Sequence, residues 1–149
     1  MGYKSVKKTD DFETAFFKLL IDAIEPGLEK LQGTILYDYP PSQAALAKIE
    51  KGVAKRFEFY IGRTELCNAF LEETNKESNI KRLITTNKKR RNLGKNFLYD
   101  TKNFFYALEQ GLPDCCGNAL GFDRWLTVLL GCDSIEKIIP FREEIYRDS

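Results

Sequence analysis

The stretch RFEFYIGRTELCNAF, residues 56–70, carries the pattern that decides the fold. Side chains between residues 56 and 61 alternate strictly between two faces, which is typical of a half-buried strand. Gly62 and Arg63 suit a tight turn, and residues 64–70 continue as a second strand. The stretch therefore predicts a β-hairpin. One face of its first strand carries Phe57, Phe59 and Ile61, and the other carries Arg56, Glu58 and Tyr60.

Two glutamates are predicted to share one face of this hairpin. If the turn is centred between residues 62 and 63, Tyr60 pairs with Glu65, and Glu58 and Cys67 lie on the same face. Two carboxylates side by side repel unless cations neutralise them or a divalent metal binds them through oxygen. A solvated polar face is the alternative, and the pattern leaves both open.

Three further polar or aromatic positions follow on the second strand and beyond it. Strict alternation would point Asn68, Phe70 and Glu72 away from Glu65. A bulge near residues 68–69 would bring them into one pocket, where Glu72 could bind a substrate ammonium and Asn68 could orient it. A polar strand edge is an equally good interpretation of the residues alone.

The segment CCGNALGFDRWLTVLLG, residues 115–131, combines a bare strand face with an arginine. Gly117, Ala119 and Gly121 leave room for a flat ligand, such as a purine, against the backbone. Arg124 follows where a helix is expected to begin, and it could donate to phosphate oxygens. The alternative is a tight connection with Arg124 paired to a carboxylate such as Asp123. Neither a GxGxxG nor a Walker loop is present.

The remaining elements predict an α+β domain built on an antiparallel sheet, because strands and helices follow in irregular order. The polar run at residues 75–96 predicts a solvated helix or loop, with a phosphate-contacting patch as the alternative. The other expected elements are a helix from Asp10 or Asp11 to Ile24 that Pro26 ends or restarts, a strand at 34–40, a short helix at 43–49 capped by Ser42, and a helix from Asp100 or Thr101 that Gly111 closes.

Composition limits the classes of function. The chain has 149 residues, 43% of them hydrophobic, which suits one domain with a sizeable core. With 23 basic and 22 acidic residues, bulk attraction to nucleic acid or membrane is not expected. The absence of histidine excludes the usual serine and cysteine triads. Cys67, Cys115, Cys116 and Cys132 lack CxxC spacing, which argues against structural zinc. No long apolar run or secretion signal is present, so a cytoplasmic location is expected.

Several motifs resemble one known family. GNALGFDRWLTVLLG resembles motif 3 of class II aminoacyl-tRNA synthetases, and RFEFYIGRTELCNAFLEETN resembles the lysine-binding stretch of lysyl-tRNA synthetases. Together with DYPPSQAALAKIEKG, NKKRR and GLPDCCGNALG, the chain is most similar to the short paralogues that attach β-lysine to elongation factor P. The resemblance runs from about residue 10 to the last residue. It implies an antiparallel sheet flanked by helices, as part of a class II catalytic core.

The resemblance also implies roles for individual residues. The reaction it implies is attack of an amino-acid carboxylate on the α-phosphate of ATP, followed by transfer of the acyl group to an acceptor. Ala119, where the tRNA-charging enzymes usually have glycine, favours β-lysine, although one methyl group is worth only about 1–3 kcal/mol. Glu58 and Glu65 would hold Mg²⁺, Asn68, Phe70, Glu72 and Ala119 would line the amino-acid pocket, Gly121 would line the adenine site, and Arg124 would act in catalysis on the γ-phosphate.

The chain also departs from the family. Motifs 1 and 2 are absent, so residues 1–149 are interpreted as a single domain, the C-terminal part of a class II catalytic domain. It would then work with a missing N-terminal half or as a homodimer. Arg63, Ala69 and Glu73 replace the usual glycine, glycine and leucine. The leading hypothesis is activation of lysine or β-lysine for transfer to elongation factor P. A lysyl-tRNA ligase fragment and a non-catalytic remnant are the alternatives.

Overall fold

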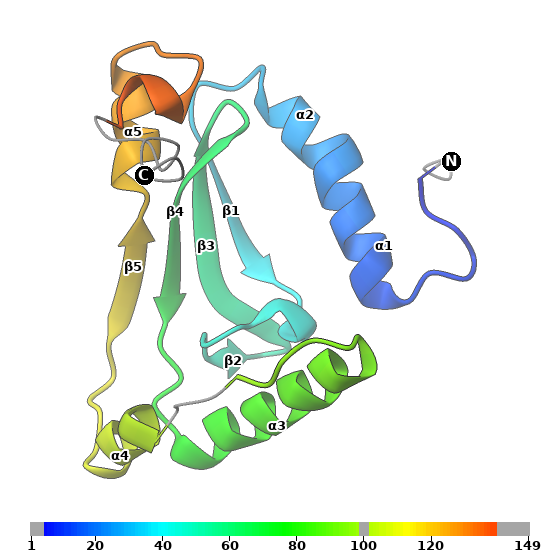
Figure 1. Ribbon diagram of the computed structural model, residues 1–149, viewed down its shortest axis with the longest axis vertical. Coiled ribbons are helices and arrows are strands. Elements are labelled where there is room, and N and C mark those ends of the chain that lie inside the picture. The colour runs from blue at the N-terminus through cyan, green and yellow to red at the C-terminus, as the bar shows by residue number, and fades with distance from the viewer. Residues whose placement is uncertain (1–4, 99–101, 140–149) are drawn as a thin grey trace, which may run out of the picture. The chain divides into compact units, whose positions relative to one another are not determined.

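The computed structural model describes residues 5–98 and 102–139, and an antiparallel sheet is its central element (Figure 1). The strands are β1 (Thr34–Tyr39), β2 (Ile49–Glu50), β3 (Val53–Ile61), β4 (Thr64–Leu71) and β5 (Cys116–Leu120). The strand order is β1-β3-β4-β5, and β2 pairs with β3 in antiparallel fashion. The predicted α+β class is therefore confirmed.

The β3–β4 hairpin forms where its alternation predicts it. Gly62 has a φ of 54° in the connecting turn, a backbone conformation that favours glycine. On β3, Glu58 and Tyr60 are both buried. On β4, the consecutive residues Leu66 and Cys67 are both buried, so this strand does not alternate strictly. The polar face of the hairpin is thus part of the interior rather than a solvated surface.

The N-terminal helix is confirmed, with an irregular second half. Asp11 caps α1 (Phe12–Leu19), and its side chain accepts a bond from the Thr14 amide. A π-helical segment, Leu20–Ile24, leads into α2 (Glu25–Leu28), which has Pro26 in its first turn. Proline thus restarts the helix, because its missing N–H is tolerated in a first turn.

The prediction of a helix at residues 43–49 is wrong. A 3₁₀ turn covers Pro41–Gln43, and the chain then turns sharply at Ala45, whose φ is 49°. Ala47 forms an antiparallel bridge with Glu72. Alanines favour a helix locally, but burial of Ala44 and Ala47 and pairing with another segment outweigh that small preference.

Three more α-helices, α3 to α5, follow in the described part of the chain. The polar run forms α3 (Lys76–Asn92), capped by Asn75, so a helix is confirmed there. Whether its cations contact phosphate stays a prediction. α4 (Lys102–Glu109) ends before Gly111, whose φ is 90°. Its predicted caps, Asp100 and Thr101, lie outside the described residues. α5 (Phe122–Leu129) follows β5, and a 3₁₀ turn covers Ile135–Lys137.

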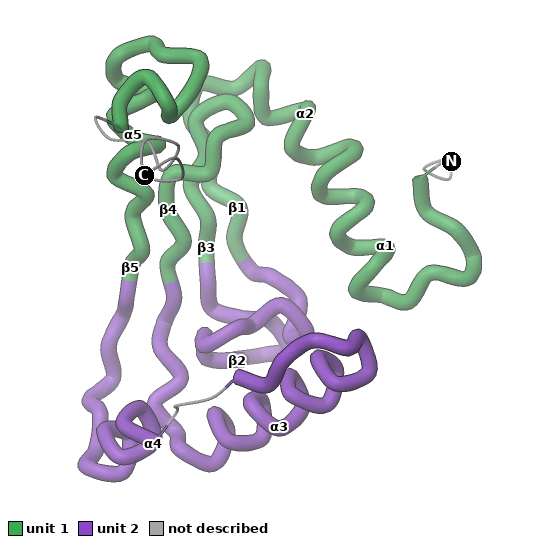
Figure 2. Tube along the Cα trace, viewed as in Figure 1, with its two compact units in different colours: residues 1–37, 57–69, 118–149 green, residues 38–56, 70–117 purple. Residues whose placement is uncertain are grey.

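The chain divides into two compact units (Figure 2). Unit 1 contains residues 1–37, 57–69 and 118–149, and unit 2 contains residues 38–56 and 70–117. Each has buried side chains of its own, such as Leu28 and Leu66 in unit 1 and Tyr39 and Leu108 in unit 2. The interpretation of the chain as one domain stays a prediction.

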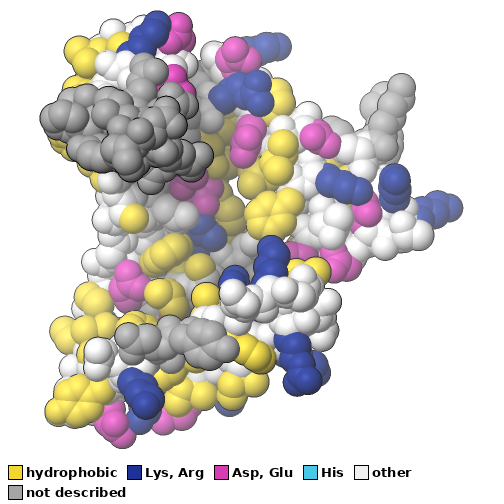
Figure 3. All heavy atoms as spheres, viewed as in Figure 1, with side chains coloured by type: hydrophobic (Ala, Val, Ile, Leu, Met, Phe, Trp, Pro, Cys, Tyr) yellow, Lys and Arg dark blue, Asp and Glu magenta, His cyan; other side chains and the backbone are white. Residues whose placement is uncertain are grey.

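Large apolar side chains are also exposed, and Figure 3 shows hydrophobic patches on the face it draws. Phe12, Tyr37 and Phe122 are more than 60% exposed, at 63%, 71% and 61%. None of the helices in the described ranges has the length and apolarity to cross a membrane.

Candidate functional site

Arg124 and Glu65 are brought together in unit 1. The amide of Gly121 donates to the Leu66 carbonyl at 2.8 Å, which fixes the start of α5 beside β4. From the first turn of that helix, Arg124 donates through Nη1 to the Glu65 carbonyl at 3.1 Å. The same nitrogen lies 3.7 Å from Oε2 of Glu65. Two residues 59 positions apart therefore form one charged pair.

Gly121 lies beside this pair as the N-cap of α5. A Cβ at this position would lie 3.4 Å from Cδ of Arg124 and 3.6 Å from the Leu66 carbonyl oxygen, which is ordinary van der Waals contact. Sterics therefore do not require glycine here. Its effect is to leave bare backbone next to the guanidinium group.

Glu58 forms a second polar cluster in unit 1. Its carboxylate is buried, with Oε2 accepting from the Tyr60 hydroxyl at 2.8 Å and Oε1 accepting from Nδ2 of Asn68 at 3.2 Å. Asn68 thus reaches Glu58, which strict alternation along β4 would not have allowed. Burial and then the bond to Glu58 raise the pKa of Tyr60 well above its ordinary value, and the charges of Glu65 and Glu25 add to this effect. Tyr60 therefore stays a protonated donor, and Glu58, Glu65 and Glu25 all act on it electrostatically.

The two glutamates fit magnesium chemically. No group of three or more His, Cys, Asp or Glu residues that could hold a metal occurs in the described part of the chain. Magnesium, however, is commonly bound by one or two carboxylates together with water and substrate phosphates. Oε2 of Glu58 accepts from Tyr60 and Oε1 accepts from Asn68, and each carboxylate oxygen has two lone pairs. The side chain of Glu65 is 33% exposed. The donor set therefore suits an ion shared with a phosphate ligand.

Phe70 is one of two aromatic rings beside the Arg56 guanidinium in unit 2. The guanidinium carbon of Arg56 lies 4.4 Å from the ring centroid of Tyr39 and 5.1 Å from that of Phe70. Nη1 of Arg56 also donates to the Gln43 carbonyl at 2.8 Å. Arg56 thus fixes the ring expected in the amino-acid pocket. The sequence places Arg56 only on a polar strand face, because the two rings that it contacts come from separate strands.

Glu72 lies against Gly117 in unit 2. Its amide donates to the Cys115 carbonyl at 2.9 Å, which joins the residue to the start of β5. A Cβ on Gly117 would overlap Oε1 of Glu72 and lie 3.3 Å from its Cδ. The space that glycine leaves at residue 117 is therefore occupied by the Glu72 carboxylate, which corrects the expectation of an open surface there.

Comparison with known proteins identifies the family. The family model for class II tRNA synthetases (D, K and N) matches residues 9–144. The chain belongs to this family. It is 37% identical over 145 residues to a protein of Vibrio cholerae named elongation factor P–(R)-β-lysine ligase, which covers 95% of this chain and 45% of that protein. Proteins of the same name from Photorhabdus laumondii and Salmonella gallinarum are 36% and 38% identical over 135 residues, covering 89% of this chain and 42% of each relative.

The chain therefore spans less than half the length of these class II relatives. Of the residues that the family resemblance assigns, the structure joins Glu65 to Arg124 and Glu58 to Asn68. Glu72 lies against Gly117, to which the resemblance assigns no role. Phe70 and Glu72 belong to unit 2, and Glu58, Glu65, Asn68, Ala119, Gly121 and Arg124 belong to unit 1. Ala119 is exposed on β5.

Proposed function

We propose that this chain is the nucleotide- and amino-acid-binding part of a ligase. It activates lysine or β-lysine with ATP and transfers the acyl group to a lysine of elongation factor P. The pairing of Glu65 with Arg124 carries this proposal, because it combines an acidic and a guanidinium group where the family resemblance expects a triphosphate. The names of the relatives supply the acceptor.

The first step needs charge and alignment more than proton transfer. A carboxylate oxygen of the amino acid attacks the α-phosphorus of ATP, pyrophosphate leaves, and an aminoacyl adenylate forms. Arg124 donates to γ-phosphate oxygens and offsets their charge. Magnesium, when held by Glu58 and Glu65, supplies further positive charge to the phosphates. No general base is required, in agreement with a chain that has no histidine.

Selection of the amino acid is the role proposed for the residues around Glu72. Its carboxylate pairs with the side-chain ammonium of the substrate, a charge-assisted contact that an uncharged analogue cannot make. Phe70 lines the rest of this pocket in unit 2. The family resemblance implies that Asn68 also contributes to binding and that Ala119 favours β-lysine. In the second step an amine of the acceptor attacks the acyl carbon, AMP leaves, and the amine loses a proton. We also propose a cytoplasmic location, where ATP and elongation factors are available.

The direct test is exchange of labelled pyrophosphate into ATP, measured with α-lysine, β-lysine and norleucine. We expect exchange with the lysines and none with norleucine, which lacks the side-chain amine. The assay is run on this chain alone and with the N-terminal half of the Vibrio cholerae relative added. Absence of lysine-dependent exchange under both conditions would contradict the proposal.

The acceptor is tested separately. Labelled lysine is offered to elongation factor P and to lysine tRNA, and we expect transfer to the protein. Transfer to the tRNA alone would support the tRNA ligase instead. Calorimetry that detects neither ATP nor lysine binding would favour a non-catalytic remnant. Sedimentation with and without the added half shows whether that half or a second copy is the partner.

A further inference from the structure

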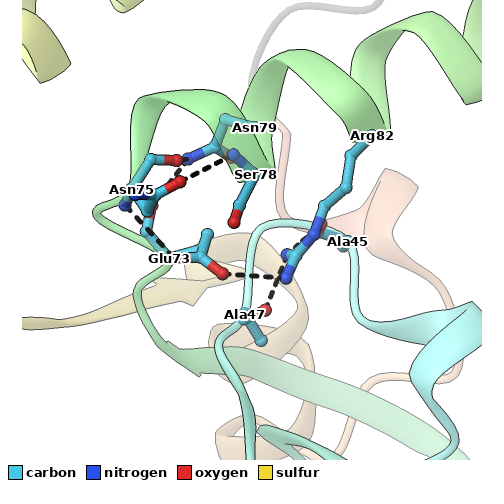
Figure 4. Close-up of polar contacts among 7 residues, drawn as sticks. All are labelled: Ala45, Ala47, Glu73, Asn75, Ser78, Asn79 and Arg82. Carbon is cyan, nitrogen blue, oxygen red and sulfur yellow. Dashed lines mark hydrogen bonds and ion pairs between the residues drawn. The ribbon is translucent and has the colours of Figure 1, made fainter.

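Arg82 of α3 lies at the centre of a polar network in unit 2 (Figure 4). Its Nη1 donates to the carbonyl oxygens of Ala45 and Ala47 at 3.0 and 2.7 Å. Its Nη2 lies 3.1 Å from Oε2 of Glu73. The side chains of Arg82 and Glu73 are only 23% and 11% exposed. This arginine therefore ties α3 both to the 45–47 loop and to the segment after β4.

Glu73 is held on every side. Its amide donates to the Leu46 carbonyl at 2.8 Å, and its carbonyl accepts from Nδ2 of Asn79 at 2.7 Å. Its Oε1 accepts from the amide of Asn75 at 3.1 Å, while Oε2 meets Arg82. The backbone next to Glu72 therefore has little freedom on its C-terminal side.

The 45–47 loop and Lys48 directly after it also hold the backbone of Glu72 from its N-terminal side. The Lys48 amide donates to the Leu71 carbonyl at 2.7 Å, and Ala47 forms a bridge with Glu72. The position of the Glu72 carboxylate thus depends on the same loop whose carbonyl oxygens bind Arg82. The loop itself departs from regular structure, since Ala45 has a φ of 49°. Without Arg82, two carbonyl oxygens and one carboxylate would lose a shared donor.

We infer that Arg82 is a positioning residue for substrate selection: by fixing the 45–47 loop and Glu73, it holds the Glu72 carboxylate where a substrate ammonium binds. The inference rests on the proposed function of Glu72. A lysine side chain at position 82 could carry the same charge. It lacks the planar guanidinium, whose several N–H groups bond to two separate elements at once. Glu73, which stands where the family usually has leucine, is the anionic partner of Arg82, so this difference from the family has a physical role.

The test measures binding of lysine, norleucine and ATP by calorimetry to the parent chain, to Arg82→Ala and to Lys81→Ala. Lys81 is an exposed residue of the same helix, so its substitution removes an equal charge. We expect Arg82→Ala to weaken lysine about tenfold, because a displaced carboxylate loses its alignment, and to leave norleucine and ATP unchanged. Lys81→Ala should bind as the parent does. Unchanged lysine affinity in Arg82→Ala, or an equal loss for all three ligands, would overturn the inference.

A second measurement does not depend on a ligand. Hydrogen exchange at the amides of Glu72 and Glu73 should become faster in Arg82→Ala and stay unchanged in Lys81→Ala. If the parent binds no lysine, the proposed function fails, and this exchange alone decides whether Arg82 fixes the segment. Equal protection in the two variants would exclude it. If Arg82→Ala does not fold, Arg82→Lys takes its place, with a smaller loss of lysine affinity and of protection expected.

Discussion

The surroundings of Arg124 in unit 1 and of Glu72 in unit 2 are built differently. Arg124 is 55% exposed and donates through Nη1 to the Glu65 carbonyl, 3.7 Å from the carboxylate of the same residue. Glu72 belongs to a backbone segment joined to two other segments and lies against a glycine. The guanidinium expected to meet phosphate is thus partly exposed, whereas the residue expected to meet an amine has its backbone held by two other segments.

This difference matches what each group has to recognise. A triphosphate offers many oxygens, so an exposed guanidinium can find a good contact from several positions. A single ammonium at the end of a flexible chain is selected only if its partner carboxylate is fixed in advance. Substitutions near Glu72 should therefore change selectivity, whereas those near Arg124 should change affinity.

The largest effect is expected from Gly117→Ala. The new Cβ would occupy the place of Oε1 of Glu72, so the carboxylate must move. Since a charge-assisted bond is worth about 1.5–3 kcal/mol, lysine affinity should fall by roughly one to two orders of magnitude, as measured by calorimetry. Gly121→Ala is the matched control, because its Cβ makes only ordinary contacts. Equal lysine affinity in the two variants would show that the location of Glu72 does not matter.

A second substitution tests the fixed part of unit 1. Glu58→Ala leaves the buried hydroxyl of Tyr60 without its acceptor, which should lower the free energy of unfolding by about 1–3 kcal/mol in urea denaturation. Glu65→Ala, which breaks a partly exposed pair, should cost about 1 kcal/mol or less. A larger loss in Glu65→Ala would reverse the assignment of the rigid and the loose carboxylate.

Arg124→Ala should weaken ATP binding by roughly tenfold, the loss of one charged contact, without changing the unfolding temperature. Lys30→Ala removes an exposed charge from the same unit and should change neither quantity. Both are measured by calorimetry and thermal unfolding. Parent-like ATP affinity in Arg124→Ala would exclude this residue from the nucleotide site.

The smallest effect near neutral pH concerns Tyr60. Because its pKa in the folded chain is raised, the unfolded chain releases this proton first, at its ordinary pKa of about 10. Stability from Tyr60 is therefore complete below pH 10 and declines as the pH rises above it. Tyr60→Phe should show a weaker alkaline loss of stability than the parent, with exposed Tyr37→Phe as control. Identical alkaline profiles for all three proteins would contradict the raised pKa.

The sequence predicts well those elements whose signal is local. The first strand of the hairpin follows from alternation over residues 56–61, and α1 follows from helical spacing after Asp11. The helix predicted at 43–49 fails because the deciding contacts come from α3 and the segment after β4. Local preference cannot outweigh partners that are distant in the sequence.

The site was predictable as a set of residue types more than as a geometry. The family resemblance names Glu58, Glu65, Glu72 and Arg124, but it does not show that the Gly121 amide bonds the start of α5 to β4, where Arg124 meets Glu65. Arg56 and Arg82 were not assigned a role, because the groups they contact lie on other segments of the chain. Whether the assigned residues bind substrate stays a prediction.

The π-helical segment Leu20–Ile24 has a consequence for the register of the first helix. A π turn contains one residue more than an α turn, so it rotates the following residues by about 100° around the helix axis. Glu25 comes directly after it and contributes to the field at Tyr60. Deleting one residue from this segment would restore regular winding, yet it would turn Glu25 away from that phenol.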